Sequence, residues 1–322
     1  MRSARWLIAT AAALFGLVGM AGGATAAPAP IRALSVTRLF AADTQGVRID
    51  RIMYTNDGLT LEALAVLPTR PATGPSHPIL VVLHGGFALD QPYVTHYPLG
   101  LTAASLVQLA LRYPQAIVLA PEYRGYMLSG GHPGMLEASA SDTRAAIRIA
   151  VRDLHGDGHG IYLLGYAMGG GVAFALAGQM PGIRAVVGVS PFVGYDIEFA
   201  WDKWEGRTGR DQPYGKVRAI FQEETFCTHF GGEPTQMPRV YAAQSPDAHI
   251  ARITAPVLLL QGTADVDVLW QATREFANKL AHAGKRVRFV LYPGGPRGLH
   301  TSPYQAESDV QIFAWFARAG LG

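Results

Sequence analysis

The run Gly165-Tyr166-Ala167-Met168-Gly169 has the spacing of a sharp strand-to-helix turn that presents a nucleophile at its tip. Such a turn is so tight that only small residues fit two positions before and after the tip. Gly165, Gly169 and the following Gly170 meet that requirement. The tip itself is Ala167, and a methyl group cannot attack a carbonyl carbon. The pattern therefore predicts the backbone of an acyl-transfer site without its nucleophile.

A glycine-rich phosphate loop is the alternative interpretation of this run. Neither G-x-G-x-x-G nor a closing Lys-Ser/Thr pair is present, so the phosphate loop is disfavoured.

The elements that would position this turn alternate between short apolar strands and helices. Ile79–Leu83 and Ala116–Ala120 have the continuous apolar pattern of buried strands, and further strands are expected at Ile161–Leu164, Ala185–Val189, Val257–Leu260 and Val287–Tyr292. Helices are expected at Leu101–Leu111, at Asp142–Val151 with Ser141 or Asp142 as N-cap, after the turn through Leu176, and at Leu269–Ala283 and Ser308–Ala319. This alternation predicts an α/β fold, a mainly parallel sheet with helices on both faces and active-site loops at the strand carboxyl ends.

Two segments depart from the alternation. Val47–Tyr54 and Leu59–Leu67, joined at Asn56-Asp57-Gly58, are typical of an N-terminal antiparallel hairpin on the sheet edge. Residues 196–241 break the regular cycle, and we expect a small insertion over the sheet end. We therefore expect residues 27–322 to form a single domain.

Several further motifs strengthen one family resemblance. They are Gly231-Gly232-Glu233-Pro234, Tyr241, Ser245-Pro246 and the run Ala255-Pro256-Val257-Leu258-Leu259-Leu260-Gln261-Gly262-Thr263-Ala264-Asp265. Together with the elbow, they make residues 47–319 resemble the peptidase domain of the prolyl oligopeptidase family. That family has the α/β-hydrolase fold and is related to dienelactone hydrolases and acyl-peptide hydrolases. The β-propeller that some members carry is not expected here.

The resemblance assigns site residues by position. Asp265 falls on the acid of the catalytic triad, with Asp267 as a competitor. His84-Gly85-Gly86-Phe87 matches the loop that helps form the oxyanion hole, through the backbone N–H of Gly86 or Phe87 together with that of Met168. His84 itself is expected to be structural.

The base position is the second departure from the family pattern. A tyrosine-proline strand end followed by His-Gly falls on Tyr292-Pro293 and then Arg297-Gly298. A guanidinium keeps its proton, so Arg297 cannot be a general base. His300, three residues on, is the alternative base if its loop is rearranged; a surface histidine is the simpler interpretation.

Alanine at position 167 has three explanations: engineered removal of a serine, natural loss, or a misplaced motif. The second departure at Arg297 favours natural loss. Deleting the serine of a comparable triad lowers kcat by on the order of a millionfold. We therefore expect a hydrolase relative with a degraded triad that binds a peptide or ester ligand. The alternatives are an active peptidase or esterase using Asp265 and His300, and a non-catalytic interaction protein that keeps the fold as scaffold.

The remaining features concern the cellular location of the protein and the partners it could bind. Arg2 and Arg5, an apolar run to about Met20 and the triplet Ala24-Thr25-Ala26 match a secretory signal, so export and cleavage near residue 26 are expected. The formal charge of +3 falls to 25 − 24 = +1 after cleavage, which gives no support for a nucleic-acid or membrane partner. No cofactor or metal is expected; His155, Asp157 and His159 are only a weak metal candidate. The lone Cys227 is expected to be a small packing residue.

Overall fold

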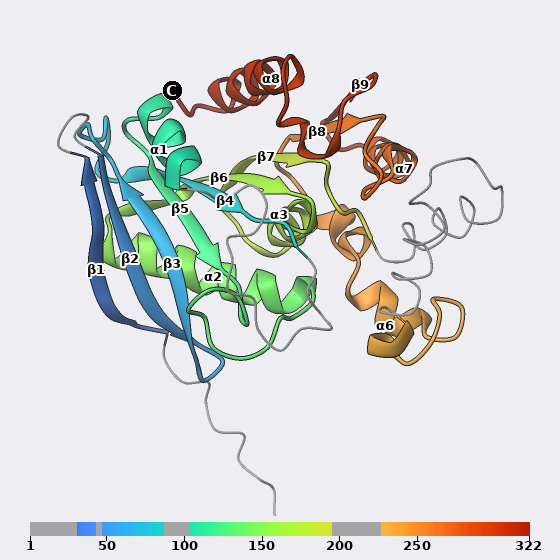
Figure 1. The fold of residues 1–322 in the computed structure, drawn as a ribbon, viewed down its shortest axis with the longest axis horizontal. Coiled ribbons are helices and arrows are strands. Elements are labelled where there is room, and N and C mark those ends of the chain that lie inside the picture. The colour runs from blue at the N-terminus through green and yellow to red at the C-terminus, as the bar shows by residue number, and fades with distance from the viewer. Residues whose placement is uncertain (1–30, 43–46, 87–102, 195–226) are drawn as a thin grey trace, which may run out of the picture.

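The computed structural model describes residues 31–42, 47–86, 103–194 and 227–322. Within these ranges the core is one nine-stranded sheet in the order β1-β2-β3-β5-β4-β6-β7-β8-β9 (Figure 1). The strands are β1 (Ala33–Ala42), β2 (Val47–Asn56), β3 (Leu59–Leu67), β4 (His77–Leu83), β5 (Ile117–Glu122), β6 (Gly156–Tyr166), β7 (Ile183–Val189), β8 (Val257–Gly262) and β9 (Val287–Tyr292).

The second half of this sheet is parallel, as expected. Strands β5, β4, β6, β7, β8 and β9 pair in parallel, and most are buried on both faces. Because strand carboxyl ends of a parallel sheet lie at one edge, β6 delivers the elbow beside the ends of β4, β7 and β8. The α/β-hydrolase fold expected from the sequence is confirmed.

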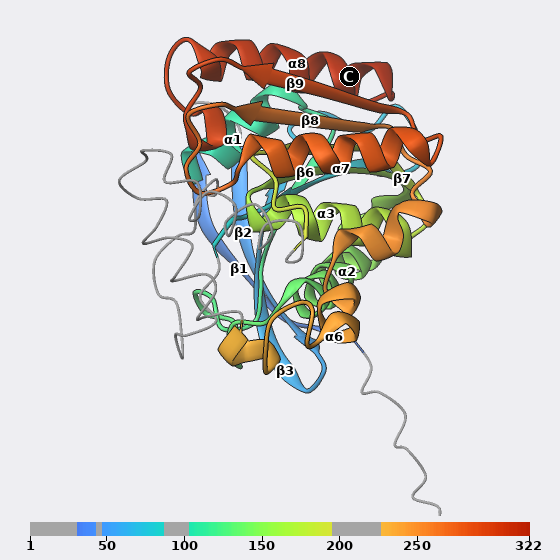
Figure 2. The same cartoon turned by 90° about the vertical axis from the view of Figure 1, so that its right-hand side faces the viewer.

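Helices cover both faces of the sheet (Figure 2). They are α1 (Ala103–Arg112), α2 (Leu136–Asp153), α3 (Met168–Gln179), α6 (Pro238–Ala243), α7 (Trp270–His282) and α8 (Tyr304–Arg318), with 3₁₀ turns η1 (Pro246–Arg252) and η2 (Arg297–Leu299). One hydrophobic core joins α2, α3 and α7 to the sheet, and a second joins α1 and α8 to the opposite face.

The N-terminal strands form the antiparallel edge of the sheet. The expected hairpin is present: β2 and β3 pair from Arg48–Leu67 to Asn56–Leu59, and Gly58 in its turn has a φ of +76°. Strand β1, which pairs antiparallel with β2 at the edge of the sheet, was not predicted. Leu34 and Val36 of β1 are about half exposed, so its residues lack the one-faced burial that produces a strand pattern.

The expected start of α2 was wrong. The helix begins at Leu136, six residues before Asp142, and Met135 is its N-cap. Asp142 lies inside the helix and is fully buried, where Arg124 donates Nε to one carboxylate oxygen at 2.9 Å and Nη2 to the other at 2.7 Å. Asn56 Nδ2 also donates to Asp142 at 2.9 Å. The Asp142 carboxylate therefore binds Arg124 of the loop after β5 and does not cap the helix.

The weak metal candidate of His155, Asp157 and His159 lies at the start of a strand. Asp157 and His159 belong to the start of β6, and His155 precedes it with a φ of +57°. Among the residues the structure describes, no group of three or more His, Cys, Asp or Glu side chains is placed to hold a metal ion. No helix in the described ranges is both long and apolar enough to cross a bilayer.

Most of the expected insertion lies outside the described residues; the structure describes it from Cys227 onward. Tyr241 of α6 is buried, packs on Phe230 with ring centroids 4.6 Å apart, and donates its hydroxyl to Gly232 O at 3.0 Å. Cys227 is half-buried beside the Tyr241 hydroxyl. Ser245 Oγ accepts the Asp247 N–H and caps η1.

Candidate active site

The elbow forms where β6 ends and α3 begins. Ala167 lies between the two elements with φ +47° and ψ −119°, a conformation that L-residues rarely adopt and that costs on the order of 1–3 kcal/mol. Its N–H donates to Val189 O at 3.1 Å, and its C=O accepts Phe192 N at 2.8 Å. The neighbouring end of β7 thus fixes the strained residue from both sides.

The glycines around the tip are required by close backbone approaches. A Cβ on Gly165 would lie 2.3 Å from Gly169 O, and one on Gly169 would lie 2.2 Å from Leu83 O of β4. A Cβ on Gly170 would lie 2.4 Å from Pro191 Cβ. The steric requirement read from the sequence is therefore present, and the side chain at its centre is a nearly buried methyl group.

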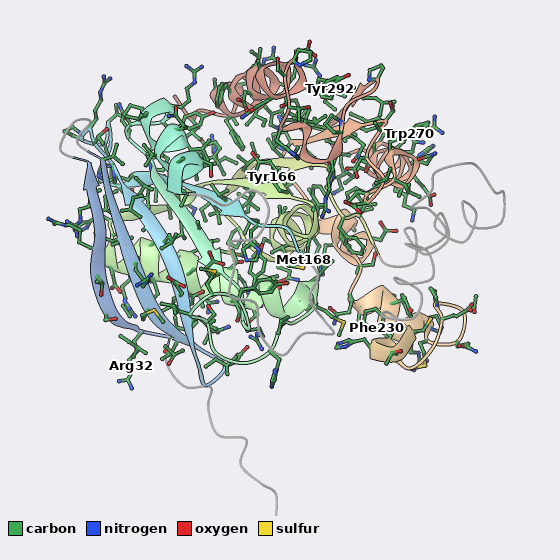
Figure 3. All side chains as sticks on the ribbon, in the orientation of Figure 1. Arg32, Tyr166, Met168, Phe230, Trp270 and Tyr292 are labelled. Carbon is green, nitrogen blue, oxygen red and sulfur yellow. The ribbon has the colours of Figure 1, made fainter. Side chains whose placement is uncertain are left out.

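The residues on either side of the tip point into different cores (Figure 3). Met168 packs in the core of α2, α3 and α7, while Tyr166 packs against the core of α1 and α8. Burial, together with the charge of Asp309, raises the pKa of the Tyr166 phenol, so it stays protonated. Tyr166 therefore supplies no substitute nucleophile at the elbow tip.

Asp265 lies just beyond the end of β8 and is buried. Its Oδ1 accepts the N–H groups of Asp267 and Val268, both at 2.9 Å, and its Oδ2 accepts Gln261 Nε2 at 3.1 Å. Burial raises the pKa of Asp265, while hydrogen bonds from its neighbours, among them the Ser190 hydroxyl, act in the opposite direction. Both carboxylate oxygens are thus already occupied by donors of the surrounding loops.

Ser190, at the end of β7, connects the acid with the loop at the base position. It is buried, has a φ of +45°, hydrogen-bonds to the Asp265 carboxylate and accepts Gly298 N on Oγ at 2.9 Å. A strained non-glycine residue is held only where its surroundings determine it. The sequence interpretation missed Ser190; its one signal is a hydroxyl residue directly after a buried strand at the site edge.

The predicted base position, Arg297, lies in η2, after β9. The Arg297 guanidinium forms an ion pair with the Asp267 carboxylate. Asp267, the competitor to Asp265 for the acid, is therefore the partner of the arginine. His300 is exposed and stands beside Gly298, and among the described residues no hydrogen bond joins it to Asp265. The structure thus brings Arg297 to Asp267 and leaves His300 unconnected to the acid.

Part of the oxyanion loop is described. Gly86 has a φ of +111°, and its carbonyl accepts the Tyr126 hydroxyl at 2.6 Å, so Tyr126, not foreseen from the sequence, helps to orient this loop. Phe87 lies outside the described residues. Met168 is the first residue of α3, so its N–H has no carbonyl partner within the helix and is placed at the positive end of the helix dipole.

His84 has a structural environment beneath this loop. It is fully buried, stacks on Tyr123 at 4.0 Å between centroids, and its Nδ1 bonds to Gly85 O at 2.9 Å. Its Nε2 lies 3.5 Å from Glu122 Oε2. Burial lowers the pKa of His84 to about 4 and, with the nearby charge of Glu62, raises that of Glu122 to about 8. That spacing would suit an ion pair, but in a buried site both groups favour their neutral forms.

The comparisons with known proteins agree with this geometry. The alpha/beta hydrolase family matches residues 80–313. The chain is 23% identical to the "Uncharacterized peptidase YtmA" of Bacillus subtilis (strain 168) over 79% of this chain and 88% of that one. It is 26% identical to acylamino-acid-releasing enzyme 1 of Oryza sativa subsp. japonica over 81% of this chain, but it spans only 32% of that enzyme's length.

Among solved structures, the acylaminoacyl peptidase of Pyrococcus horikoshii superposes with a TM-score of 0.65 at 16% sequence identity. The superposition covers 85% of this chain and 42% of the peptidase. At this identity the likeness concerns the fold.

Proposed function

The chain belongs to the alpha/beta hydrolase family, and from this premise we propose that it is an exported relative of peptidases and esterases with impaired catalysis. In this proposal the elbow region binds a peptide or ester ligand without turning it over. The observation that carries the proposal is the elbow tip, where the strained backbone of a nucleophile elbow carries the methyl group of Ala167.

Loss of chemistry is supported at each triad position. An acyl-enzyme needs a hydroxyl or thiol, and Ala167 has neither. A base must accept a proton, whereas the Arg297 guanidinium keeps its own and is paired with Asp267. The acid must orient an imidazole, whereas Asp265 accepts hydrogen bonds from its own loop, Gln261 and Ser190.

Ligand binding is supported by what remains. The Met168 N–H stands at the start of α3 and Gly86 is oriented by Tyr126, so backbone donors for a carbonyl oxygen are still arranged near the tip. An oxyanion hole acting alone leaves roughly a thousandfold rate enhancement over water, which is too little for a dedicated hydrolase. Retained donors without a nucleophile favour binding over turnover.

The test is labelling with a serine-directed fluorophosphonate, together with hydrolysis of nitrophenyl esters and Xaa-Pro amides. We expect no label and background turnover for the unmodified chain, trace activity for Ala167→Ser, and higher activity for Ala167→Ser with Arg297→His. Ala243→Ser, which places a hydroxyl on an exposed position of α6, is the matched control and should stay unlabelled. Robust turnover by the unmodified chain would overturn the proposal.

The two restored variants separate the alternatives. If Ala167→Ser alone regains the full rate, His300 is the base and the assignment of Arg297 to the base position is wrong. If the double variant exceeds the single one, position 297 is the base position. Binding without turnover is tested separately, by calorimetric titration of the unmodified chain with a non-hydrolysable peptide ketone.

Export is a separate part of the proposal, supported by the basic, apolar and small-residue order of residues 1–26. Expression in a bacterial host, followed by fractionation and mass determination of the mature chain, tests it. We expect a periplasmic or secreted product beginning near residue 27. A full-length product retained in the cytoplasm would contradict this expectation.

A further inference from the structure

A cavity of about 600 Å³ opens at the end of the sheet opposite the elbow. Its wall includes Ile183 and Arg184 at the start of β7, Thr254 and Pro256 before β8, and Arg286 before β9. The last turn of α8 adds Trp315 and Arg318. We call this the Arg/Trp pocket. Strand β7 is seven residues long, so the pocket lies roughly 20 Å from the elbow, at the amino ends of the strands.

Three exposed arginines line this pocket. Arg184, Arg286 and Arg318 come from three different elements, which the parallel pairing of β7, β8 and β9 brings side by side. Arg184 hydrogen-bonds to the Tyr162 hydroxyl. In the part of the chain that the structure describes, none of the three has a carboxylate within ion-pair distance. Like charges gathered without a counter-charge repel, and an anion in their midst relieves that repulsion.

The frame beneath the pocket is held in place. Val186 N donates to Pro256 O at 3.0 Å, and Val257 N donates to Arg286 O at 2.8 Å, so the segments entering the three strands are tied together. The Tyr162 hydroxyl donates to Ala319 O at 3.0 Å and fixes the end of α8 on β6. The backbone segments that carry the three arginines are therefore held side by side.

Trp315 adds an aromatic side chain to the wall of the pocket. The residue is half-buried and lines the pocket from α8, and its indole N–H is buried without an acceptor among the described residues, so the ring offers the pocket apolar surface and no N–H donor. A guanidinium fork matches the oxygens of a phosphate in a bidentate manner, and an aromatic wall favours a planar apolar body. A volume of about 600 Å³ lies in the range of small-molecule sites.

We infer that the Arg/Trp pocket binds a small organic phosphate, with the phosphate among the three arginines and an apolar or aromatic body against Trp315. A neutral sugar or lipid would leave the arginines without a counter-charge. A nucleic acid needs an extended basic surface, and the formal charge of the chain is only +3. This inference is independent of the function proposed for the elbow.

Calorimetric titration of the unmodified chain with phenyl phosphate tests the inference, beside phenol and inorganic phosphate. We expect phenyl phosphate to bind more tightly than either. Arg286→Gln with Arg318→Gln should weaken it about a hundredfold, roughly tenfold for each charge-assisted contact that is removed. Arg38→Gln, which removes one exposed arginine from β1 far along the sheet, is the matched control and should change the affinity less than twofold.

The aromatic part has its own variant. Trp315→Leu should make phenyl phosphate and inorganic phosphate bind equally, and Trp315→Phe should restore the preference; the melting temperature of each variant checks its folding. The inference is overturned if the unmodified chain shows no binding of phenyl phosphate at millimolar concentration. It is equally overturned if Arg38→Gln weakens binding as much as the double variant does, or if an oligonucleotide binds more tightly than phenyl phosphate.

Discussion

Replacing Glu122 by glutamine should stabilise the protein in alkaline solution. Both carboxyl oxygens of Glu122 are buried without a hydrogen-bond partner, and Glu62 pairs with it across β3 and β5. Burial and the charge of Glu62 together raise the pKa of Glu122 to about 8. His84 donates Nδ1–H to Gly85 O, so its Nε2 is an acceptor facing the protonated acid. Glutamine keeps the shape and a donor while removing the ionisation.

The size of the effect follows from the pKa difference. The native state holds the Glu122 proton up to pH 8, while the unfolded chain releases it at about 4.5, a gap of 8 − 4.5 = 3.5. Stability from the neutral acid is therefore fully present below pH 4.5 and is lost as the pH rises to 8. At about 1.4 kcal/mol per pH unit, the loss is a little over 3 kcal/mol at pH 7 and about 5 kcal/mol above pH 8.

His84 has the opposite sign. Its pKa is lowered from 6.5 to about 4, so the stability of the neutral imidazole is present above pH 6.5 and is lost as the pH falls to 4. This contribution is common to the parent chain and to Glu122→Gln. It therefore cancels when the two are compared at one pH.

The assay is urea unfolding followed by circular dichroism, at pH values below 4.5, near 7 and above 8. The variant and the parent should be similar at the lowest pH, and the variant should gain the amounts above as the pH rises. Glu307→Gln, an exposed acid in the first turn of α8, is the control and should show no such trend. A gap between Glu122→Gln and parent that stays constant within about 1 kcal/mol would refute the assignment of a neutral, buried Glu122.

Three further changes test the frame of the site, each measured by denaturant unfolding. Gly169→Ala places a Cβ 2.2 Å from Leu83 O in a central strand that cannot move, so we expect a loss of about 3 kcal/mol or failure to fold. Arg124→Gln leaves the buried Asp142 carboxylate without its guanidinium and should cost about 3 kcal/mol. Ser190→Ala removes one donor and one acceptor in a buried site and should cost about 1–2 kcal/mol, and an unchanged stability would show that this bridge is not formed in solution.

The parallel core was predictable because burial of a strand on both faces shows directly in its local sequence. Runs such as Val257–Leu260 are apolar throughout, as a strand buried on both faces must be, and β8 is found at these residues. The glycines of the elbow were equally informative, because a 2.2 Å approach between Gly169 and the backbone of Leu83 tolerates no side chain. A constraint that acts on neighbouring residues leaves a pattern in the sequence.

Partnerships across the fold, by which we mean ion pairs and hydrogen bonds between residues distant in the sequence, left no such pattern. Asp142 has the local character of a helix cap, and only the arrival of Arg124 from the loop after β5 makes it an internal ion pair. Arg297 and Asp267 likewise meet because β8 and β9 are neighbours, thirty residues apart in sequence. The edge strand β1 was missed for the opposite reason: exposure on both faces removes the alternation that periodicity detects.

These partnerships also bear on the impaired catalysis that we propose, because they hold the elbow and Asp265 in place without a catalytic side chain. The strained Ala167 is held by backbone bonds to Val189 and Phe192 and by the close approach of glycines, none of which involves a hydroxyl group. Asp265 anchors its own loop, and Ser190 joins it to the loop of Arg297. Asp265 and Ser190 thus have hydrogen-bond partners that do not depend on an imidazole or on a hydroxyl at the elbow tip, as the proposed loss of catalysis requires.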